Sequence, residues 1–448
     1  MIMMSLTKQM LRQTTVFFFF LLLTGLLEAG VQPVIGPKLF FNEGRSAADV
    51  AVDSSGNIYM VGNTAQFPRK PSGFDAFVAK LNKNGSIIFS LILSGSKDDL
   101  AYSVAIDPFG NILVAGETES SDFPIKNAFQ PHKLNRRDAF VVKLNGNGDL
   151  IYSTYLGGGS LEKVSSISTD NEGNAYIVGR TNSTNFPLVH PLQSQKKSGS
   201  DAFITKLDPS GSPIYSTFLG GDSIDFATAI AADSSGNAYI GGVTCSSDFP
   251  SQQAMFSTLQ GNCDAFISKL NADGSQFIFS TYFGGSDYDQ LSDLVIDHGN
   301  NIYFTGDTFS TDYPVKNAVQ PRNHGNVDVF ITKLSSDLGS VSYSTYFGGP
   351  NGDSQGKLAI DSRGRVFVSA FIVGKGVPKV NAIPGEKTNG YFLILLSHNG
   401  KFLFSTPYAQ SVVRNVNVNS TGSRFYLAGS LLPALSPATI AIIKKTID

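Results

Sequence analysis

Hydrophobic and polar residues alternate over short stretches along most of this chain, and turns containing Asp, Asn and Gly separate the stretches. Alternation with a period of two is typical of β-strands that bury one face. Many stretches are joined by turns such as Asp53–Gly56 and Asp233–Gly236, in which the first side chain can bond the backbone and glycine can adopt a positive φ. The pattern therefore predicts a succession of β-hairpins.

These hairpins recur in pairs, about every 63 residues. The first hairpin of the unit occurs seven times, as AVDSSGNIYMVG (51–62), AIDPFGNILVAG (105–116), STDNEGNAYIVG (168–179), AADSSGNAYIGG (231–242), VIDHGNNIYFTG (295–306), AIDSRGRVFVSA (359–370) and NVNSTGSRFYLAG (417–429). The second hairpin has a leading strand such as DAFITKL from Asp201 and a trailing strand such as YSTFLGG from Tyr215. Four short strands per repeated unit are typical of β-propeller blades.

The two ends of the repeat array indicate how it closes. Residues 39–43 resemble a fourth strand without the first three, and residues 439–444 resemble a third strand without a fourth. A closed ring leaves no sheet edge exposed at its ends. We therefore expect an all-β, seven-bladed β-propeller of four-stranded antiparallel blades, closed by an N-terminal strand that completes the last blade. A single domain is expected over residues 31–448.

The recurring motifs DAF[VI]xKL, YST[YF][LF]GG, DxxGN and DFP resemble those of the bacterial β-propeller repeat family abbreviated SBBP. The resemblance covers roughly residues 39–448 and is strongest in the first five units. It implies a propeller fold and an exported or surface location. It implies no common enzymatic activity.

Residues 1–30 differ from the rest of the chain and predict a secretory signal peptide. Lys8 and Arg12 precede an apolar run over residues 16–23, and cleavage is expected after Ala29. The alternative is an uncleaved anchor, although the run is too short to span a bilayer. We expect an exported protein that is secreted, periplasmic or attached to the cell surface, with no transmembrane span after cleavage.

Composition narrows the choice of partners. The 448 residues carry 34 Lys and Arg against 36 Asp and Glu, which gives a net charge of -2 and no excess of basic residues for binding nucleic acid.

The two cysteines, Cys245 and Cys263, flank a long loop in the fourth unit. In an oxidising compartment they are candidates for a disulfide; the alternative is two free thiols.

One acidic position recurs in the loops between units, and the candidate site residues there are Asp99, Glu162, Asp225, Asp289 and Asp353. Arg45 and Ser411 hold this position in the first and last units. In a closed ring these carboxylates would surround the mouth of the central channel and could bind calcium or a cationic ligand. The alternative, which we favour, is that each carboxylate caps its own loop through backbone N–H groups.

The sequence contains none of the common catalytic motifs GxSxG, HExxH, GK[ST] or GxGxxG in the expected context. We therefore expect a monomeric binding or scaffold module that contacts a protein or glycan at the cell surface through its long-loop face. The alternative is a glycan-acting hydrolase or lyase that uses the channel-mouth carboxylates. The DFP aromatics are interpreted as packing residues and the lysine of DAFITKL-type strands as solvent-exposed.

Overall fold

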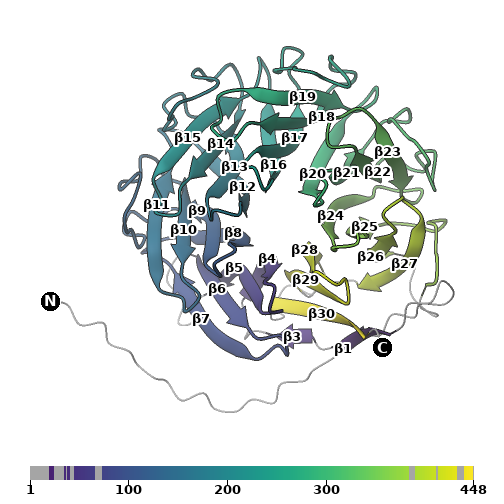
Figure 1. The fold of residues 1–448 in the computed structure, drawn as a ribbon, viewed down its shortest axis with the longest axis horizontal. Coiled ribbons are helices and arrows are strands. Elements are labelled where there is room, and N and C mark those ends of the chain that lie inside the picture. The colour runs from purple at the N-terminus through teal and green to yellow at the C-terminus, as the bar shows by residue number, and fades with distance from the viewer. Residues whose placement is uncertain are drawn as a thin grey trace.

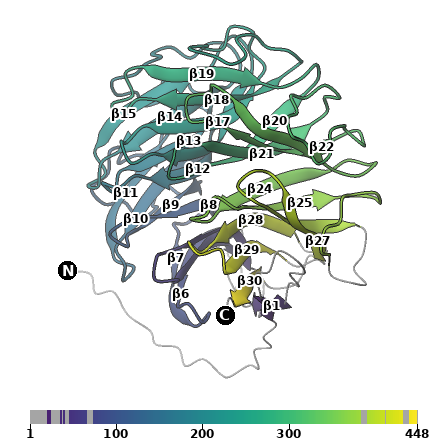
Figure 2. The same cartoon turned by 45° about the vertical axis from the view of Figure 1, so that its right-hand side comes forward.

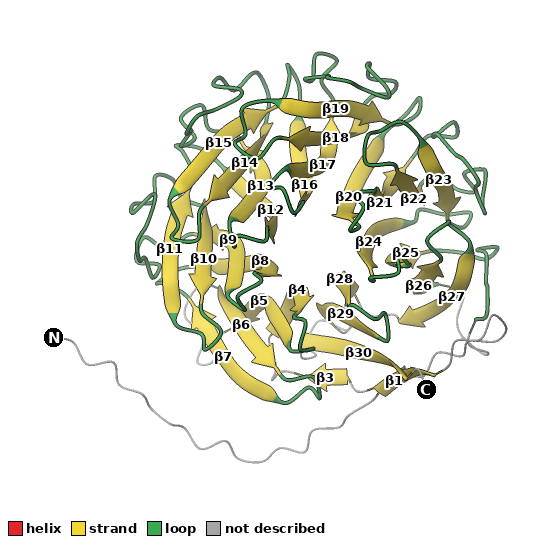
Figure 3. Cartoon of the chain, viewed as in Figure 1, coloured by secondary structure: helices red, strands yellow, loops and turns green. Residues whose placement is uncertain are grey.

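A computed structural model shows a ring of β-sheets around a central axis (Figures 1 and 2). It describes residues 20–24, 35–36, 38–40, 45–65, 73–382, 389–409, 412–430 and 438–446. Over these ranges the chain consists of strands, turns and loops (Figure 3), and none of it forms a helix that could cross a membrane.

Six of the sheets are antiparallel blades of four strands each, and the chain runs outward from the axis through each of them. Blade 1 contains β4 (Arg45–Val52), β5 (Ile58–Ala65), β6 (Phe74–Leu81) and β7 (Ile87–Leu93); blade 2 contains β8 (Asp99–Ile106), β9 (Ile112–Thr118), β10 (Asp138–Leu144) and β11 (Leu150–Leu156); blade 3 contains β12 (Glu162–Thr169), β13 (Ala175–Thr181), β14 (Asp201–Leu207) and β15 (Pro213–Leu219). Blade 4 contains β16 (Asp225–Ala232), β17 (Ala238–Thr244), β18 (Asp264–Leu270) and β19 (Phe277–Phe283); blade 5 contains β20 (Asp289–Ile296), β21 (Ile302–Thr308), β22 (Asp328–Leu334) and β23 (Val341–Phe347); blade 6 contains β24 (Ser354–Ile360), β25 (Val366–Ile372), β26 (Gly390–Leu396) and β27 (Phe402–Ala409).

The remaining sheet, here called the closing sheet, lies between blade 6 and blade 1 (Figure 1). It contains β28 (Val412–Val418), β29 (Arg424–Ser430), β30 (Ala438–Thr446), β1 (Phe20–Thr24), β2 (Ile35–Gly36) and β3 (Lys38–Phe40). β3 pairs antiparallel with β30, with Leu39 opposite Ile440, whereas β1 pairs parallel with β30, with Leu21 opposite Ile443.

The prediction of seven four-stranded antiparallel blades is wrong, because only six sheets of the described chain have that form. The physical reason is the length of β30. It has nine residues, and the three-residue β3 pairs with only residues 439–441 of its edge. An unpaired strand edge presents free N–H and C=O groups, and here β1 pairs with residues 443–446. β1 lies within the predicted signal peptide, whose predicted cleavage site falls outside the described residues.

The turn between the first two strands of each blade follows from its sequence. In blade 4, Asp233 Oδ1 accepts hydrogen bonds from the N–H groups of Ser235 and Asn237, each at 3.0 Å. Gly236 has φ of +79° and donates its N–H to Asp233 O at 3.0 Å. The aspartate and the glycine therefore recur because the turn needs an acceptor side chain first and a residue that tolerates positive φ last; Asn419 and Asn300 meet these needs in the two turns that depart from the pattern.

Adjacent sheets are fastened to one another around the axis by side chains of the innermost strands. A bulge in β4 between Ala47 and Asp49 accompanies a carboxylate that reaches both neighbours. Asp49 Oδ2 accepts hydrogen bonds from Val104 N at 2.8 Å and Ser103 Oγ at 3.0 Å in blade 2, while Asp49 Oδ1 accepts one from Asn415 Nδ2 in the closing sheet. Ring closure is therefore carried by polar contacts as well as by packing.

The hydrophobic core lies mainly between neighbouring sheets. One cluster joins Val178 and Ile204 of blade 3 to Ile240 and Phe266 of blade 4. Another joins Phe77 and other residues of blade 1 to Tyr426 and Ala428 of the closing sheet. Because both faces of a blade are buried in this way, each blade depends on its two neighbours for stability.

Candidate functional site

The five predicted site carboxylates occupy equivalent places at the long-loop end of the innermost strands. Four of them begin β8, β12, β16 and β20, and the fifth directly precedes β24. All five have an exposed fraction of 0%; they are Asp99, Glu162, Asp225, Asp289 and Asp353. Ser411 and the side chain of Arg45 lie outside the described residues.

Each carboxylate bonds the loops of its own blade. Asp225 Oδ2 accepts hydrogen bonds from Gly221 N at 2.7 Å and Ser246 Oγ at 2.8 Å. Asp289 Oδ2 accepts the corresponding bonds from Gly285 N at 2.6 Å and Ser310 Oγ at 2.8 Å. These contacts are those expected of a loop cap.

A second buried aspartate lies beside each predicted carboxylate, and sequence reasoning did not assign it to the site. It is the first residue of the DAF motif, and its five copies are Asp75, Asp138, Asp201, Asp264 and Asp328. Its recurrence, in four of the five copies together with the two glycines that end the YST[YF][LF]GG motif, was the signal that could have revealed the pairing. The first glycine lies between the two side chains: an ideal Cβ on Gly220 would lie 2.8 Å from Asp201 Cγ and 2.9 Å from Asp225 Oδ2.

The paired carboxyl groups hold protons more tightly than carboxyl groups in water. Burial raises the pKa of Asp201 to about 6, and the nearby charge of Asp225 acts in the same direction. Burial likewise raises the pKa of Asp264 and of Asp289 to about 6. Oδ1 of Asp328 is buried without a hydrogen-bond partner, and burial raises the pKa of Asp328 to about 6 as well. Two buried carboxyl groups at short distance are expected to share a proton.

A ligand could reach these pairs only if the surrounding loops moved. Two cavities along the axis are lined by other residues. Among the described side chains, no group of three or more His, Cys, Asp or Glu residues is arranged to hold a metal ion. Calcium binding, and glycan hydrolysis by these carboxylates, therefore stay predictions.

The larger cavity lies at the opposite end of the channel from the predicted site. Asp225 begins β16 and Asp233 follows its last residue, so these two residues lie at opposite ends of the strand. The cavity, here called the hairpin mouth, has a volume of about 660 Å³ and is lined by hairpin turns of blades 3 to 6 and the closing sheet. Lining residues include Asn171, Ser234, His298, Ser362, Arg363 and Ser420. A smaller cavity of about 380 Å³ follows the channel and is lined by innermost strands.

The lysine of the DAFITKL-type strands is buried in Lys143 and Lys206 and half-buried in Lys80, Lys269 and Lys333, contrary to the prediction of a solvent-exposed position. Lys143 is 1% exposed, and its Nζ lies 3.0 Å from Asp107 Oδ2 in its own blade. Lys143 Nζ also donates a hydrogen bond to Gly173 O in the next blade at 2.8 Å. The lysine therefore links adjacent turns on the hairpin side, because burial of an ammonium group requires a counter-charge and acceptors.

The DFP aromatics pack inside the blades. The ring of Phe123 lies 4.6 Å from that of Phe140 between centroids, and Phe123 is 3% exposed. Tyr313 holds the same position against Phe330 at 4.5 Å. These rings anchor the long loops and leave little aromatic face for stacking on a carbohydrate. Phe67 of blade 1 lies outside the described residues.

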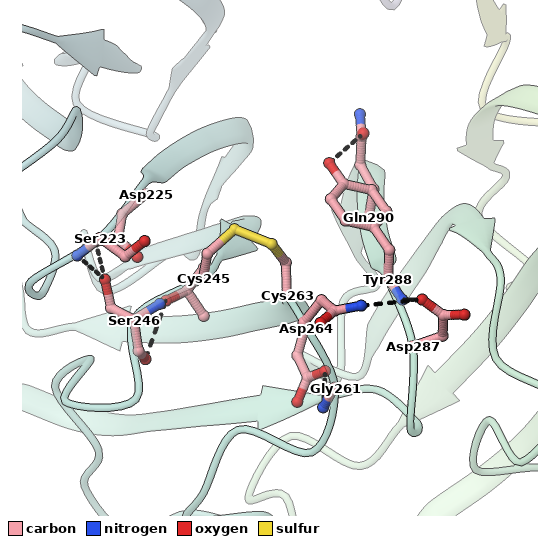
Figure 4. The surroundings of a disulfide bond; sticks show 12 residues. Ser223, Asp225, Cys245, Ser246, Gly261, Cys263, Asp264, Asp287, Tyr288 and Gln290 are labelled. Atoms are coloured by element: carbon pink, nitrogen blue, oxygen red, sulfur yellow. Dashed lines mark hydrogen bonds between the residues drawn. A yellow bond between two sulfur atoms is a disulfide. The ribbon is translucent and has the colours of Figure 1, made fainter.

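Cys245 and Cys263 form a disulfide that closes the base of the long loop of blade 4 (Figure 4). Ser246, next in the chain to Cys245, accepts a hydrogen bond from Ser223 N at 2.8 Å and donates one to Asp225. Asp264, next to Cys263, is the partner of Asp289. The disulfide thus connects two strand ends that carry buried carboxylates.

Replacing both cysteines in Cys245→Ser/Cys263→Ser should lower the free energy of unfolding by about 3 kcal/mol, because the unfolded chain regains the entropy of an open loop. Urea unfolding of the two proteins measures the difference. A reducing agent should lower the urea concentration at the unfolding midpoint of the wild type and leave the midpoint of the double variant unchanged. An unchanged wild-type midpoint, or two titratable thiols in the unreduced unfolded protein, would contradict the prediction.

Solved structures with the same architecture define the class of the fold. The β-propeller domain of Cps50 (Swd1) from Myceliophteria thermophila aligns over 91% of this chain and 100% of its own, with a TM-score of 0.51 at 10% identity. Hydrazine synthase from Kuenenia stuttgartiensis aligns over 92% of this chain and 98% of its own, with a TM-score of 0.54 at 11% identity. At such identities the likeness concerns the fold alone, which is a β-propeller.

The sequence comparisons specify the kind of propeller. Residues 88–124, 151–187 and 214–250 match the SBBP beta-propeller repeat. The predicted resemblance is thereby confirmed: these three segments of the chain are SBBP β-propeller repeats. Each match begins at the outer strand of one blade and extends through the first two strands of the next.

One curated relative is the regulatory protein FlaEY of Caulobacter vibrioides, with 27% identity over 217 residues. The aligned region is 47% of this chain and 22% of FlaEY, so this chain matches about a fifth of that protein.

Proposed function

We propose that this protein is a binding scaffold whose ligand contacts the hairpin mouth. One observation carries the proposal: turns from five neighbouring sheets surround a cavity of about 660 Å³ lined largely by polar and charged side chains. Cavities of this size suit small ligands or an anchoring group of a larger partner. The regulatory role named for FlaEY is consistent with a binding function, although it belongs to a much longer protein.

The hairpin mouth is preferred to the long-loop face because the long loops are already engaged. In blade 2, Ser153 and Lys126 exchange backbone hydrogen bonds of 2.7 and 3.2 Å, so the loop lies along the outer strand β11. Ser216 with Val189, and Ser344 with Lys316, repeat the arrangement in blades 3 and 5. Loops fixed in this way protect sheet edges. The long-loop face is the competing surface.

We further propose that the protein acts outside the cytosol. The disulfide between Cys245 and Cys263 supports this location, since disulfides persist in oxidising compartments. The basic and apolar N-terminal residues support it independently. Sequencing the N-terminus of the protein recovered from its native source tests the location, and recovery of an intact Met1 in the cytosolic fraction would contradict it.

The variant Ser362→Trp should weaken ligand binding, because an indole ring at this lining position would occupy part of the hairpin mouth. Ser121→Trp, at an exposed position in a long loop, is the matched control. The wild-type chain is first screened by thermal shift against sugars, nucleotides and organic acids, and on a glycan array. We expect each ligand to lose at least about tenfold in affinity with Ser362→Trp and to keep its affinity with Ser121→Trp. The reverse result would favour the long-loop face.

A further inference from the structure

The repeats of this chain supply an internal comparison of the turns around the hairpin mouth. The first and last positions of each turn recur because the turn geometry requires them. The two middle positions are free to vary, and they are Ser54–Ser55, Pro108–Phe109, Asn171–Glu172, Ser234–Ser235, His298–Gly299, Ser362–Arg363 and Ser420–Thr421. Of these, His298 and Arg363 bring an imidazole and a guanidinium to turns of adjacent blades that line one cavity. The fold does not require either residue type there.

The acidic groups of the hairpin mouth are occupied by partners of their own. Asp361 Oδ1 accepts hydrogen bonds from Arg363 N at 3.0 Å and Arg365 N at 2.9 Å, and Arg365 Nε donates to Asp361 Oδ2 at 2.7 Å. Asp297 Oδ2 accepts hydrogen bonds from Tyr303 at 2.9 Å and from Asn301 Nδ2 at 2.8 Å. These carboxylates are therefore satisfied by their own turns.

Asp233, the third lining carboxylate, lies 3.2 Å from Lys269 Nζ, so its charge is also compensated. Lys333 Nζ lies 4.0 Å from Asp297 and donates a hydrogen bond to His398 O at 3.2 Å.

Three side chains of the hairpin mouth remain available to a ligand. Arg363, His298 and His398 are exposed, and their side chains make no hydrogen bond or ion pair with the described residues. A guanidinium group presents a planar fork of donors that matches a carboxylate or phosphate, and imidazole N–H groups add further donors. The hydroxyl groups of Ser234 and Ser362 line the same cavity.

We infer that the hairpin mouth binds an anionic group, a phosphate or a carboxylate, through Arg363 with His298 and His398 beside it. This inference rests on the proposed function. Charge-assisted hydrogen bonds to a guanidinium are stronger than neutral ones, so Arg363 is the principal contact. The ligand's uncharged remainder would occupy the part of the cavity lined by Ile296 and Ile360.

Titration calorimetry of the full chain at low salt, with inorganic phosphate in one arm and citrate in the other, tests the inference. We expect at least one anion to bind and its affinity to fall at least about tenfold in Arg363→Gln. Double replacement in His298→Asn/His398→Asn should weaken binding less. The matched control is Arg322→Gln, an exposed arginine in the long loop of blade 5, which should bind as the wild type does. The arm that responds identifies the anion.

Two results would overturn the inference: neither anion binds, or Arg363→Gln and Arg322→Gln lose affinity equally. Its failure can be distinguished from failure of the proposed function. A neutral ligand that Ser362→Trp displaces, with no binding of either anion, would retain the hairpin mouth as the binding site and reject its anionic specificity.

Discussion

The free energy of unfolding of this protein should fall as the pH rises from about 5 to about 7.5, because buried carboxyl groups must then ionise in the folded state. Burial raises the pKa of six aspartates to about 6; they are Asp49, Asp201, Asp264, Asp289, Asp328 and Asp353. A folded-state pKa above the unfolded value gives stability that is complete below the unfolded pKa and is lost as the pH rises through the folded pKa.

The size of the effect follows from these values. A rise from the ordinary 3.8 to about 6 in one aspartate corresponds to about 3 kcal/mol of unfolding free energy. About half of this loss falls above pH 5, because the unfolded group begins to ionise near pH 4. Several such groups contribute, although the groups of a pair are coupled and do not add fully, so we expect a total loss of at least about 3 kcal/mol between about pH 5 and about pH 7.5. Urea unfolding at a series of pH values measures the loss.

A separate group of aspartates limits stability at lower pH. Burial acts to raise the pKa of Asp297, but hydrogen bonds from Asn301 and Tyr303 outweigh it and hold the pKa below its ordinary value. Such groups contribute stability above their unfolded pKa and lose it as the pH falls through the folded pKa. Maximum stability is therefore expected in mild acid.

Asp328→Asn identifies the source of the pH dependence. Asp328 Oδ2 accepts hydrogen bonds from Gln320 Nε2 at 2.7 Å and His324 N at 3.0 Å, which an amide oxygen can also accept. The amide nitrogen would replace the unpartnered Oδ1, close to Asp353. This variant should be more stable than the wild type at about pH 7.5. Its free energy of unfolding should fall less than that of the wild type between about pH 5 and about pH 7.5. The exposed Asp273→Asn is the control and should keep the wild-type slope. A wild-type protein that gains stability over this range would refute the prediction.

Gly284→Ala should lower the free energy of unfolding by about 2 to 4 kcal/mol, as expected when a methyl group is forced into a packed polar site. An ideal Cβ at this position would lie 2.6 Å from Asp264 Oδ1 and 2.7 Å from Asp289 Oδ2. Both side chains are buried and hydrogen-bonded to their own loops, so neither can withdraw without losing those bonds. Urea unfolding at about pH 5, where the wild type is expected to be more stable than at neutral pH, measures the change.

The matched control for Gly284→Ala is Gly352→Ala, in the loop that follows blade 5. An added Cβ there would meet no atom within 4 Å, so we expect a change within about 0.5 kcal/mol. Equal losses in the two variants would show that glycine matters for backbone freedom alone. No loss in Gly284→Ala would show that Asp264 and Asp289 leave room for a methyl group at this position.

Much of the blade could be predicted from the sequence because its determinants are local. Asp233 and Gly236 specify a turn wherever they occur, and alternating residues specify which face of a strand is buried. The roles of Lys143 and Asp201 could not be predicted in the same way. The acceptors of Lys143 include Gly173 in the next blade, and the neighbour of Asp201 is Asp225, on a different strand. Neither the contact of Lys143 with Gly173 nor the proximity of Asp201 to Asp225 can be recognised from the sequence pattern of a single strand.

By itself, the sequence determined the repeated four-stranded unit and the presence of SBBP repeats, since both depend on motifs that recur at fixed spacing. The tertiary structure decided the form of the closing sheet, because the pairing of β30 with both β1 and β3 depends on strand lengths and edges from opposite ends of the chain. It also decided that the recurrent carboxylates are buried in pairs and that the larger cavity lies at the hairpin mouth. These features arise only when sheets distant in sequence close around one axis.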